Sequence, residues 1–404
     1  MSAPEVSVVE LFVGPDARVV NVWDQYTYRL SMLEVGVAWT FTFPFSEHAG
    51  SAWDELLDPV TGIKCGHKIT LAVDGDAVFS GIVETVKAGD TDPSKSPAVL
   101  VISGRDALGP AVSWDALPTL TLRGRAFGDA VQAVYQGVGI VADIGASVDP
   151  GATVGRLRGS RARRGRMHAR TARNEAVRAS HPRIGERAHQ VVERMAKALG
   201  YRVWTTPVEG SGMTGVIVDR PRTGAAQVSL VRERVNGKVT DASNIWAGAR
   251  TTSIANIPST LTVFSDKERG DSESDQIARE VTNGYLFTEA AAAEVDFEAV
   301  NQPRFVQSRN ASTEAGAQNE AARLLAEANE RFRTYDCTVL GHRLGGRLLV
   351  PNLLADVRDD LAKVTGRWLI VSVEGSGSRD AAQTTKLSLL PEGALSVIPE
   401  PEPT

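Results

Sequence analysis

The residues with the clearest chemical potential form one arginine-rich run in the middle of the chain. The stretch RLRGSRARRGRMHAR, residues 156–170, holds seven arginines and no acidic residue. From Gly155 to Arg194 the chain has twelve arginines against three glutamates, a net charge of +9. A guanidinium group binds phosphate and carboxylate groups through paired hydrogen bonds. The run therefore predicts contact with an acidic partner, which is either a nucleic acid or a protein.

The surroundings of the run favour a protein partner. Between Arg156 and Arg178 there is no aromatic residue on which a base could stack, and neither a Cys–His finger nor a helix-turn-helix pattern frames the segment. Because the whole chain carries −5, the residues outside 155–194 carry −14, unlike a dedicated nucleic-acid binder. Nucleic-acid binding by 156–178 is the alternative, and a solvated loop or a processing site are further interpretations. The candidate protein-contact residues are Arg156, Arg158, Arg161, Arg163, Arg164, Arg166 and Arg170.

Residues that commonly bind metals or act as nucleophiles are scattered along the chain. None of the six histidines stands at a metal-ligand spacing such as HExxH, so we interpret them as surface or capping residues. Cys65 and Cys337 are about 270 positions apart, which indicates two buried or half-buried thiols and neither a disulfide framework nor a metal pattern. No GxSxG nucleophile turn is present. We therefore expect no catalytic residue, no cofactor and no metal.

Two further groups of residues could suggest ligand binding but have simpler interpretations. The glycine-rich pieces 209–215 and 374–378 lie between expected strands, whereas a phosphate loop needs a strand before it and a helix after it. We interpret both pieces as turns. Asp356, Asp359 and Asp360 could bind a divalent ion, but a solvated loop end is the simpler interpretation.

Length and composition predict a soluble chain of several domains. A chain of 404 residues exceeds one ordinary core, and its 42% hydrophobic and 23% charged residues are typical of globular proteins. No apolar run approaches the roughly 20 residues that cross a bilayer. The start MSAPEVSVVE lacks a basic region and an apolar stretch, so we expect no signal peptide and no membrane insertion.

Alternating patterns predict that residues 5 to about 115 form strands. Apolar residues alternate in 26–32 and in 39–43, and residues 98–109 predict a strand that enters a loop. Within 65–86, Asp74-Gly75-Asp76 supplies a tight turn between two alternating stretches, which predicts a hairpin. Short strands with turns and no helices between them favour a barrel or a sandwich.

The middle of the chain predicts two helix–glycine–strand units. In 127–144 a helical stripe ends at Gly137 and Gly139, and in 184–205 a second stripe ends at Gly200 before the strand 201–204. A hairpin then passes through 209–213 into 216–218. The arginine-rich residues 155–180 lie between the two units, so we expect them to be an insertion.

The last part of the chain returns to strands. The β pattern resumes near 243, a polar insertion follows at 265–303, and an amphipathic helix is expected at 312–333. Strands are expected near 335–342, 348–357, 366–375 and 384–390. The expected domains are 1–115, 116–225 with the insertion, 226–392, and a loose Pro/Glu-rich tail at 393–404.

The order of these pieces resembles the baseplate hub proteins of contractile-tailed phages and contractile injection systems, the Mu-type hub and late-control protein D family. The resemblance extends over roughly 5–395. It rests on GHKITLAVDGDAVFSGIVETV followed by VISGRDALGPAVSWDA, on RIGERAHQVVERMAKALGYRVWT, and on the closing RLLVPNLLADVRDDLAKVTGRWLIVSVEGSGSRDAAQTTKLSLLP. The arginine-rich insertion is not part of the family pattern.

The resemblance implies a fold and a role. The fold would be mainly β with an α+β middle: two tail-tube-like β-barrel domains plus a small α/β domain. The protein would be a non-enzymatic homotrimer that adapts the hexameric tail tube to the trimeric central spike. Further partners would be tape-measure and baseplate wedge proteins, with DNA at most in transit through the lumen. We expect the acidic remainder of the chain to line that lumen, where it would repel DNA.

The implied location is the virion tail baseplate or an injection particle, assembled in the bacterial cytoplasm. Phages and genome-free injection particles use the same hub, so the sequence does not distinguish between these two locations. A peptidoglycan hydrolase is a third class of function, but no residue pattern favours it.

Overall fold

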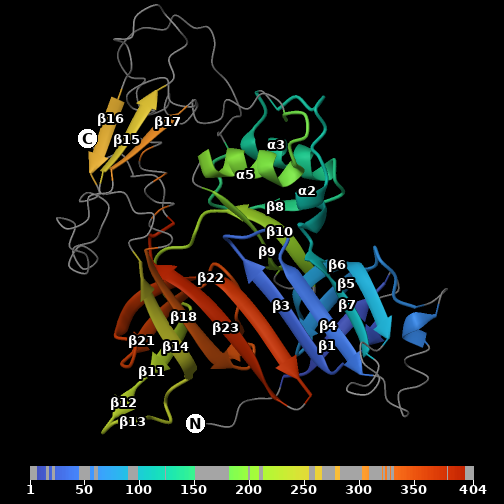
Figure 1. Ribbon diagram of the computed structural model, residues 1–404, viewed down its shortest axis with the longest axis vertical. Helices are drawn as coiled ribbons and strands as arrows, with labels where there is room; N and C mark the ends of the chain where they lie inside the picture. The colour runs from blue at the N-terminus through green and yellow to red at the C-terminus, as the bar shows by residue number, and fades with distance from the viewer. Residues whose placement is uncertain are drawn as a thin grey trace, which may run out of the picture.

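The structure is a computed structural model. It describes residues 7–14, 18–20, 23–44, 55–58, 62–89, 99–122, 124–150, 182–198, 201–208, 213–253, 260–265, 278–282, 303–308, 321, 324, 328, 332–379 and 381–395. A broad sheet forms the base of the molecule, and a smaller unit with helices lies above part of it (Figure 1).

The base is one sheet of thirteen strands in the order β14-β18-β23-β22-β3-β4-β7-β6-β5-β1-β2, with β21 paired to β22 and β11 to β21. We call its two parts the N-terminal and the C-terminal β unit. The N-terminal β unit comprises β1 (Val9–Val13), β2 (Arg18–Val20), β3 (Gln25–Ser31), β4 (Ala38–Pro44), β5 (Lys68–Val73), β6 (Asp76–Gly89) and β7 (Val99–Asp106). The C-terminal β unit comprises β11 (Val228–Arg232), β14 (Ile245–Thr252), β18 (Arg333–Leu340), β21 (Leu354–Asp359), β22 (Val364–Ser378) and β23 (Ala381–Pro391).

The β5–β6 hairpin shows how local sequence sets the N-terminal β unit. Asp74 and Gly75 both have positive φ, 53° and 83°, which is the two-residue turn that matches the twist of paired strands. Val73 lies opposite Asp76 directly across this turn. The hairpin expected at 65–86 is therefore confirmed.

Each β unit has a core of its own. Alternating strand residues bury one face, and in the N-terminal β unit these side chains are largely aromatic, including Tyr26, Tyr28, Trp39, Phe41 and Phe79. In the C-terminal β unit they are largely aliphatic: Leu230, Val339, Val357, Ile370 and Leu389 are among them. Full burial of such side chains contributes about 1.5–3 kcal/mol each.

The two β units repeat one arrangement of strands. The order β3-β4-β7-β6-β5-β1 corresponds to β14-β18-β23-β22-β21-β11, and corresponding strands also follow one another in the same order along the chain. A β-bulge interrupts β6 after Val83 and β22 after Ile370, in each case after the third residue pair with the next strand. One difference is that β1 is antiparallel to β5, whereas β11 is parallel to β21.

The repeat holds at the level of single residues. In each unit, a row of directly opposed residues can be followed from one strand to the next. We start each row on the bulged strand, three residues after the residue that precedes the bulge. The row in the N-terminal β unit is Val86, Ile102, Phe41 and Tyr26, and the row in the C-terminal β unit is Val373, Leu387, Cys337 and Gly248.

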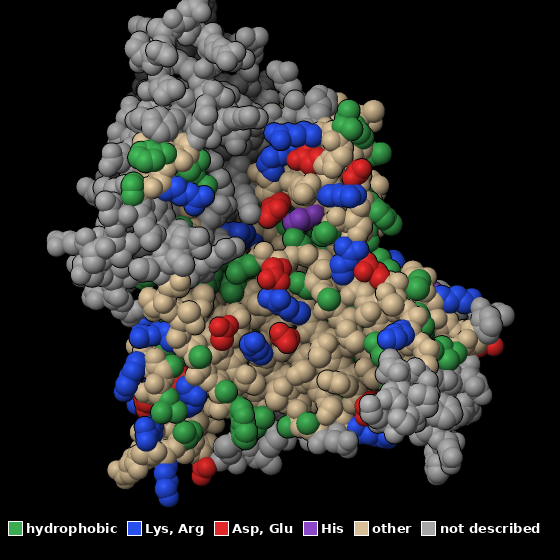
Figure 2. Space-filling view, viewed as in Figure 1, with side chains coloured by type: hydrophobic (Ala, Val, Ile, Leu, Met, Phe, Trp, Pro, Cys, Tyr) green, Lys and Arg blue, Asp and Glu red, His purple; other side chains and the backbone are tan. Residues whose placement is uncertain are grey.

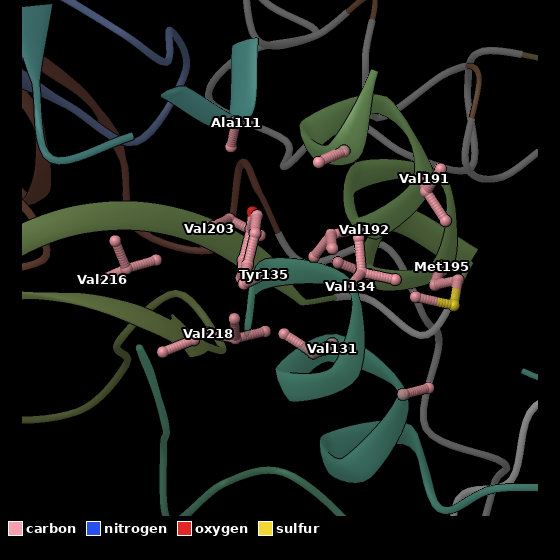
Figure 3. Packing of buried hydrophobic residues seen from close by; sticks show 14 of the residues in the cluster. Ala111, Val131, Val134, Tyr135, Val191, Val192, Met195, Val203, Val216 and Val218 are labelled. Carbon is pink, nitrogen blue, oxygen red and sulfur yellow. The ribbon is translucent and has the colours of Figure 1, made fainter. Parts of the chain in front are cut away.

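The unit above the sheet is built from helices on a short mixed sheet. Its elements are α2 (Gly109–Ser113), α3 (Phe127–Gln136), β8 (Ala142–Ile144), α5 (Ala188–Ala198), β9 (Arg202–Val208) and β10 (Met213–Asp219), with sheet order β8-β10-β9. Figure 3 shows Val131 and Val134 of α3 beside Val192 of α5, with Val203 and Val218 of the strands in the same core. The two predicted helical stripes and the strand after each are confirmed.

Smaller elements lie in the second half of the chain. They are the hairpins β12 (Arg234–Val235) with β13 (Lys238–Val239) and β19 (Arg343–Leu344) with β20 (Arg347–Leu348), and a separate sheet of β15 (Thr260–Ser265), β16 (Ala278–Thr282) and β17 (Pro303–Ser308). The predicted helix at 312–333 is helical at its described positions Ala321, Leu324 and Ala328, but Arg333 already begins β18. The expected polar insertion at 265–303 contains strand β16.

The predicted fold class, mainly β with a small α/β part in the middle, is confirmed, and three local predictions are wrong. The strand expected at 348–357 is β21, which begins only at Leu354. Residues 374–378 are the end of strand β22 and not a turn. The loose tail does not begin at 393, because Leu395 is 1% exposed and packs with Leu354, Leu369, Val371 and Leu390. The domain boundaries stay predictions.

Candidate functional site

Side chains that could bind metals or attack substrates lie apart from one another. Among the described residues, no group of three or more His, Cys, Asp or Glu side chains could hold a metal ion. Cys65 is exposed and Cys337 is buried, so the expectation of two buried or half-buried thiols is wrong for Cys65. Burial raises the pKa of the Cys337 thiol to about 12, which keeps it protonated and unreactive at neutral pH.

Two histidines are core residues, contrary to the expectation of surface or capping roles. The ring of His342 is completely buried, with Nε2 2.6 Å from the Tyr26 hydroxyl and Nδ1 2.8 Å from the Thr385 hydroxyl. Burial lowers the pKa of His342 to about 4, so this ring is neutral at pH 7. His189 is 6% exposed, and its Nδ1 lies 3.3 Å from the Tyr135 hydroxyl. His48, His168 and His181 lie outside the described residues, and His67 is half-buried.

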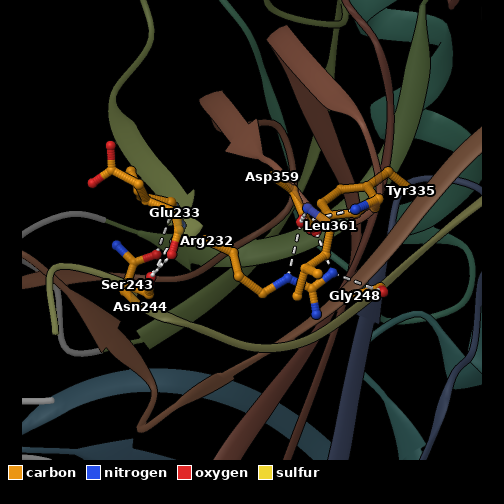
Figure 4. Close-up of polar contacts among 10 residues, drawn as sticks. Arg232, Glu233, Ser243, Asn244, Gly248, Tyr335, Asp359 and Leu361 are labelled. Carbon is orange, nitrogen blue, oxygen red and sulfur yellow. Dashed lines mark hydrogen bonds and ion pairs between the residues drawn. The ribbon is translucent and has the colours of Figure 1, made fainter. Parts of the chain in front are cut away.

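The acidic group at the end of β21 contains a buried ion pair. Asp359 is fully buried and accepts hydrogen bonds from Arg232 Nε at 2.9 Å, Arg232 Nη2 at 2.6 Å and the Tyr335 hydroxyl at 2.5 Å (Figure 4). Burial alone would raise the pKa of the Asp359 carboxyl, but the hydrogen bonds from Arg232, Tyr335 and the Ala362 N–H hold it below its usual range. The interpretation as a solvated loop end is therefore wrong for Asp359.

Arg232 of this ion pair also connects the two outermost strands of the C-terminal β unit, β11 and β14. Arg232 ends β11, and its Nη2 also donates to the carbonyl of Gly248 in β14 at 3.1 Å. Nearby, the backbone N–H of Asn244 donates to the Val231 carbonyl and the N–H of Val231 donates to Asn244 Oδ1 (2.9 and 2.8 Å). Side chains thus connect β11 to β14 where the two strands form no ladder, so the cluster has a structural role.

The junction of the two β units lies between β22 and β3. These strands are antiparallel over seven residue pairs, from Ser372 opposite Ser31 to Ser378 opposite Gln25. A Cβ atom on Gly375 would lie 2.2 Å from Cε1 of Tyr28, and one on Gly377 would lie 2.7 Å from Cε1 of Tyr26. Glycine is required at both positions, because the tyrosine rings lie against the backbone there.

Sequence reasoning missed this junction, although a signal for it exists. The spacing Tyr26-x-Tyr28 and the spacing Gly375-x-Gly377 have the same two-residue period. In an antiparallel pair, large side chains with this period fit opposite small ones.

The face of the sheet opposite the cores is rich in hydroxyl groups. Ser376 lies 3.0 Å from Thr384, Ser388 donates to Asp336 at 2.6 Å, and Arg29 donates to Ser372 at 3.2 Å, all on this face. We call it the hydroxyl face. Figure 2 shows a broad area without charge, with a few separate acidic and basic side chains.

The charges on the hydroxyl face do not make it acidic. Register places Thr27, Arg29, Glu374, Lys386 and Asp336 on this face in adjacent strands, and their rows continue through β4 and β7 to β6. The charged residues in these rows are Arg29, Lys87, Arg105 and Lys386 against Asp336 and Glu374. Glu34 and Glu84 also lie here, because they form ion pairs with Arg29 and Arg105. Basic and acidic residues therefore balance in this part of the face.

A small hollow lies between the β3–β4 connection and α5. Its volume of about 20 Å³ is enough for one water molecule. His189 and Glu193 are the acid–base groups in it, with 3.8 Å between Nε2 and Oε2. The lining residues are Met32, Leu33, Val35, His189, Glu193, Ala196, Tyr201, Arg202 and Val203, and no Ser, Thr or Cys nucleophile is among them.

The arginines singled out in the sequence lie outside the described residues, since these end at 150 and resume at 182. Arg156, Arg158, Arg161, Arg163, Arg164, Arg166 and Arg170 therefore stay predicted contact residues. Within the described part of the chain, no helix is long and apolar enough to cross a membrane.

Solved structures resemble nearly the whole of this chain. No protein-family model and no curated protein matches it. Among solved structures, it is similar to the 43 kDa tail protein of prophage MuSo2 from Shewanella oneidensis, with a TM-score of 0.72 and 18% identity over 96% of this chain and 99% of the other. It is also similar to a tail protein from Neisseria meningitidis MC58, with a TM-score of 0.71 and 19% identity over 98% and 100%. The prophage tail protein gp18 from Listeria monocytogenes EGD-e has a TM-score of 0.52 and 9% identity over 96% and 97%. The chain therefore has the fold of these tail proteins.

Proposed function

We propose that this chain is the structural baseplate hub of a contractile tail, a homotrimer that adapts a hexameric tail tube to a trimeric central spike. The internal repeat of the two β units is the observation that carries the proposal. A ring of three chains with two similar β units each presents six similar units. Such a ring matches sixfold symmetry on one side through the β units and threefold symmetry on the other through the rest of the chain.

The comparisons support a structural role in a tail. The similar solved structures are named tail proteins, and their likeness spans almost the whole of each chain. The proposed partners are the tail tube, the spike, the tape-measure protein and baseplate wedges, and the proposed location is the baseplate of a virion or injection particle assembled in the bacterial cytoplasm. No enzymatic activity is part of the proposal.

The hydroxyl face suits the wall of a conduit, but its charge differs from the charge that we expected for the lumen. We expected an acidic lumen, but basic and acidic residues balance on the described part of this face. Ser and Thr hydroxyls bind water without fixing a charge near DNA. If this face lines the lumen, DNA in transit passes a hydrated wall and is not repelled by acidic residues.

The native mass of the purified chain tests the proposal. Light scattering at several concentrations and moderate salt should give three times 43.2 kDa, and electron microscopy of that species should show a ring of six lobes. A chain that stays monomeric alone and with tail tube and spike proteins would refute the trimeric hub.

A further inference from the structure

We propose that Asn236 is a modification site, at which the chain itself converts the side-chain amide to a carboxylate with loss of ammonia. Asn236 and Gly237 form the turn of the hairpin β12–β13, which connects β11 to β14 and extends away from the broad sheet (Figure 1). The net reaction consumes one water molecule and releases one ammonia molecule. The inference does not depend on the proposed hub function.

The pair Asn-Gly offers the least hindered route to this reaction. Hydroxide removes the proton of the Gly237 N–H, the nitrogen attacks Cγ of Asn236, and the bond between Cγ and the amide nitrogen breaks. The amide nitrogen takes a proton from water and leaves as ammonia, so that a five-membered imide ring remains. Water then opens the ring at one of its two carbonyl groups, which yields aspartate or isoaspartate. A side chain on the second residue would hinder the attack, and glycine has none.

The shape of the turn controls this attack. Asn236 has a φ of 50° and Gly237 a φ of 83°, as in the two-residue turn of tight hairpins. In such a turn the peptide unit between the two residues must rotate before its nitrogen reaches Cγ. Glycine permits the rotation, because it populates positive and negative φ about equally. The reaction rate therefore depends on how easily this turn changes its shape.

Little holds the tip of the hairpin in place. The ladder of β12 and β13 has two residue pairs, Arg234 with Val239 and Val235 with Lys238. Every residue from 234 to 239 is exposed, and even the apolar side chains of Val235 and Val239 are 53% and 48% exposed. A two-stranded hairpin without a covered face is only marginally stable in water. Such a segment opens locally without unfolding the rest of the chain.

The turn Asp74-Gly75 in the β5–β6 hairpin provides a comparison inside the chain. Its φ values, 53° and 83°, nearly equal those of the Asn236 turn. Asp74 Oδ1 accepts a hydrogen bond from the Val8 N–H at 2.8 Å, and Asp74 Oδ2 accepts one from Arg343 Nε at 3.2 Å. The Asp74 N–H also donates to the Val8 carbonyl at 2.8 Å. This turn is therefore tied to two other segments of the chain.

The amide of Asn352 is also held, although this residue has a positive φ of 67° as well. Its Oδ1 accepts a hydrogen bond from the Arg222 N–H at 2.7 Å, and its Nδ2 donates to the Arg220 carbonyl at 3.5 Å. The Asn236 amide, by contrast, forms no hydrogen bond within the part of the chain that the structure describes. It can therefore turn towards the backbone without losing a partner there.

A guanidinium group lies beside the reacting peptide unit. Arg234 Nη2 is 3.6 Å from the position that a Cβ atom on Gly237 would occupy. The attack places negative charge on the Gly237 nitrogen and then on the amide oxygen of Asn236. Because a nearby cation stabilises developing negative charge, Arg234 should accelerate closure of the imide ring.

The two products change the hairpin in different ways. Aspartate adds one negative charge between Arg234 and Lys238 and leaves the backbone as it was. Isoaspartate carries the main chain through Cβ, which adds one atom to a turn of two residues. The pair Val235–Lys238 then no longer fits the tight turn that sets its register.

Peptide mapping by mass spectrometry tests the inference in the intact chain. After incubation at mildly alkaline pH, the peptide with Asn236 should gain about 1 Da, and an isoaspartate-specific methyltransferase should label it. Asn352 should convert at least about fivefold more slowly, because its two amide hydrogen bonds must break first. Conversion of Asn236 no faster than that of Asn352 would overturn the inference. The other Asn-Gly pair, 283–284, lies outside the described residues and is mapped on its own peptide.

A matched control separates the effect of the turn from that of the sequence. Asp74→Asn creates an Asn-Gly pair in the same kind of turn, and its side chain keeps the hydrogen bond from the Val8 N–H. The new amide at position 74 should convert at least about fivefold more slowly than Asn236 in the same molecules. Equal rates at the two positions would mean that the loose turn does not select Asn236.

Removal of the neighbouring cation gives a second readout. Arg234→Gln keeps most of the length of the side chain and removes its charge, so conversion of Asn236 should slow by up to about fivefold. Lys68→Gln, which removes an exposed cation from β5, is the control and should leave the rate unchanged. Equal rates in these two variants would refute the part assigned to Arg234.

Discussion

The two β units have the same strand order but different interiors. The N-terminal β unit packs aromatic rings, with Tyr26 5.7 Å from Phe41 and Trp39 6.1 Å from Phe41 between ring centroids. The C-terminal β unit packs aliphatic side chains and buries the ion pair of Arg232 with Asp359. Corresponding positions differ in chemistry: Phe41 matches Cys337, and Tyr26 matches Gly248.

This difference shows which properties the repeat preserves. Strand order, the bulge and the residue register are the same in both units, while core side chains are exchanged freely. Interiors tolerate many hydrophobic combinations if volume and pattern are kept. The repeat therefore preserves backbone geometry and not the chemistry of the core.

The largest effect should come from the buried ion pair of Arg232 with Asp359 in the C-terminal β unit. Asp359→Ala would leave Arg232 buried without its carboxylate and should lower the free energy of unfolding by about 3–5 kcal/mol. Denaturant titration measures this. Arg358→Ala, which removes an exposed pair with Glu233, is the control and should lose less than about 1 kcal/mol. Similar losses for both would show that the buried cluster does not hold β11 to β14.

The next effect is a pH dependence at the contact between the β units. The pKa of His342 is about 4 in the fold against 6.5 when unfolded, so its contribution is complete above pH 6.5 and is lost as the pH falls towards 4. Between pH 6.5 and 5 this amounts to about 2 kcal/mol. Denaturant titration at both pH values should show that acidification costs the native chain about 2 kcal/mol more than it costs His342→Gln.

Asp106 provides the opposite control for this measurement. Burial raises its carboxyl pKa to about 6, so the fold gains stability as the pH falls through 6 towards 4. Asp106→Asn should therefore make the native loss on acidification larger, whereas His342→Gln makes it smaller. Parallel pH profiles for both variants would contradict the assignment of acid sensitivity to His342.

A smaller effect is expected where β22 meets β3. Gly375→Ala places a methyl group against the Tyr28 ring and should lower the free energy of unfolding by about 1–3 kcal/mol. In a Tyr28→Leu background the same change should cost less, because the ring is gone. A double-mutant cycle by denaturant titration measures this coupling, and additive losses would mean that the glycine is not needed for the ring.

The smallest effect on stability is expected from the arginine-rich segment. Replacing Arg161, Arg163, Arg164 and Arg166 with Ser should change the free energy of unfolding by less than about 0.5 kcal/mol but should reduce particle assembly, because the segment is predicted to dock on an acidic protein. Unchanged particle yield would contradict docking. Binding of the unaltered chain to DNA that weakens about 10³–10⁵-fold between 50 and 200 mM salt would instead support the nucleic-acid alternative.

Features set by neighbouring residues could be predicted from the sequence. The Asp74-Gly75 turn dictates its hairpin, and the stripe of Val191, Val192 and Met195 dictates the buried face of α5. The helices of the α/β unit and the strand after each follow from such local patterns.

Features that depend on distant partners could not be predicted. Gly375 looks like a turn residue until Tyr28, almost 350 positions earlier, lies against it. Asp359 looks solvated because its partner Arg232 is 127 positions away. The repeat cannot be found by comparing the two parts of the sequence. Where one unit has an aromatic residue, the equivalent position of the other unit has an aliphatic or small one.

The β22–β3 junction also sets the order of events during synthesis. About 340 residues separate Ser31 from Ser372. At 5–20 residues per second, the ribosome needs roughly 17–70 seconds to supply β22 after β3 has been made. During this time the β3 edge of the N-terminal β unit lacks its partner strand β22. Exposed strand edges can pair with other chains. A nascent chain of this protein is most vulnerable to premature association during this interval, when the edge that its own last strands will cover is open to neighbours.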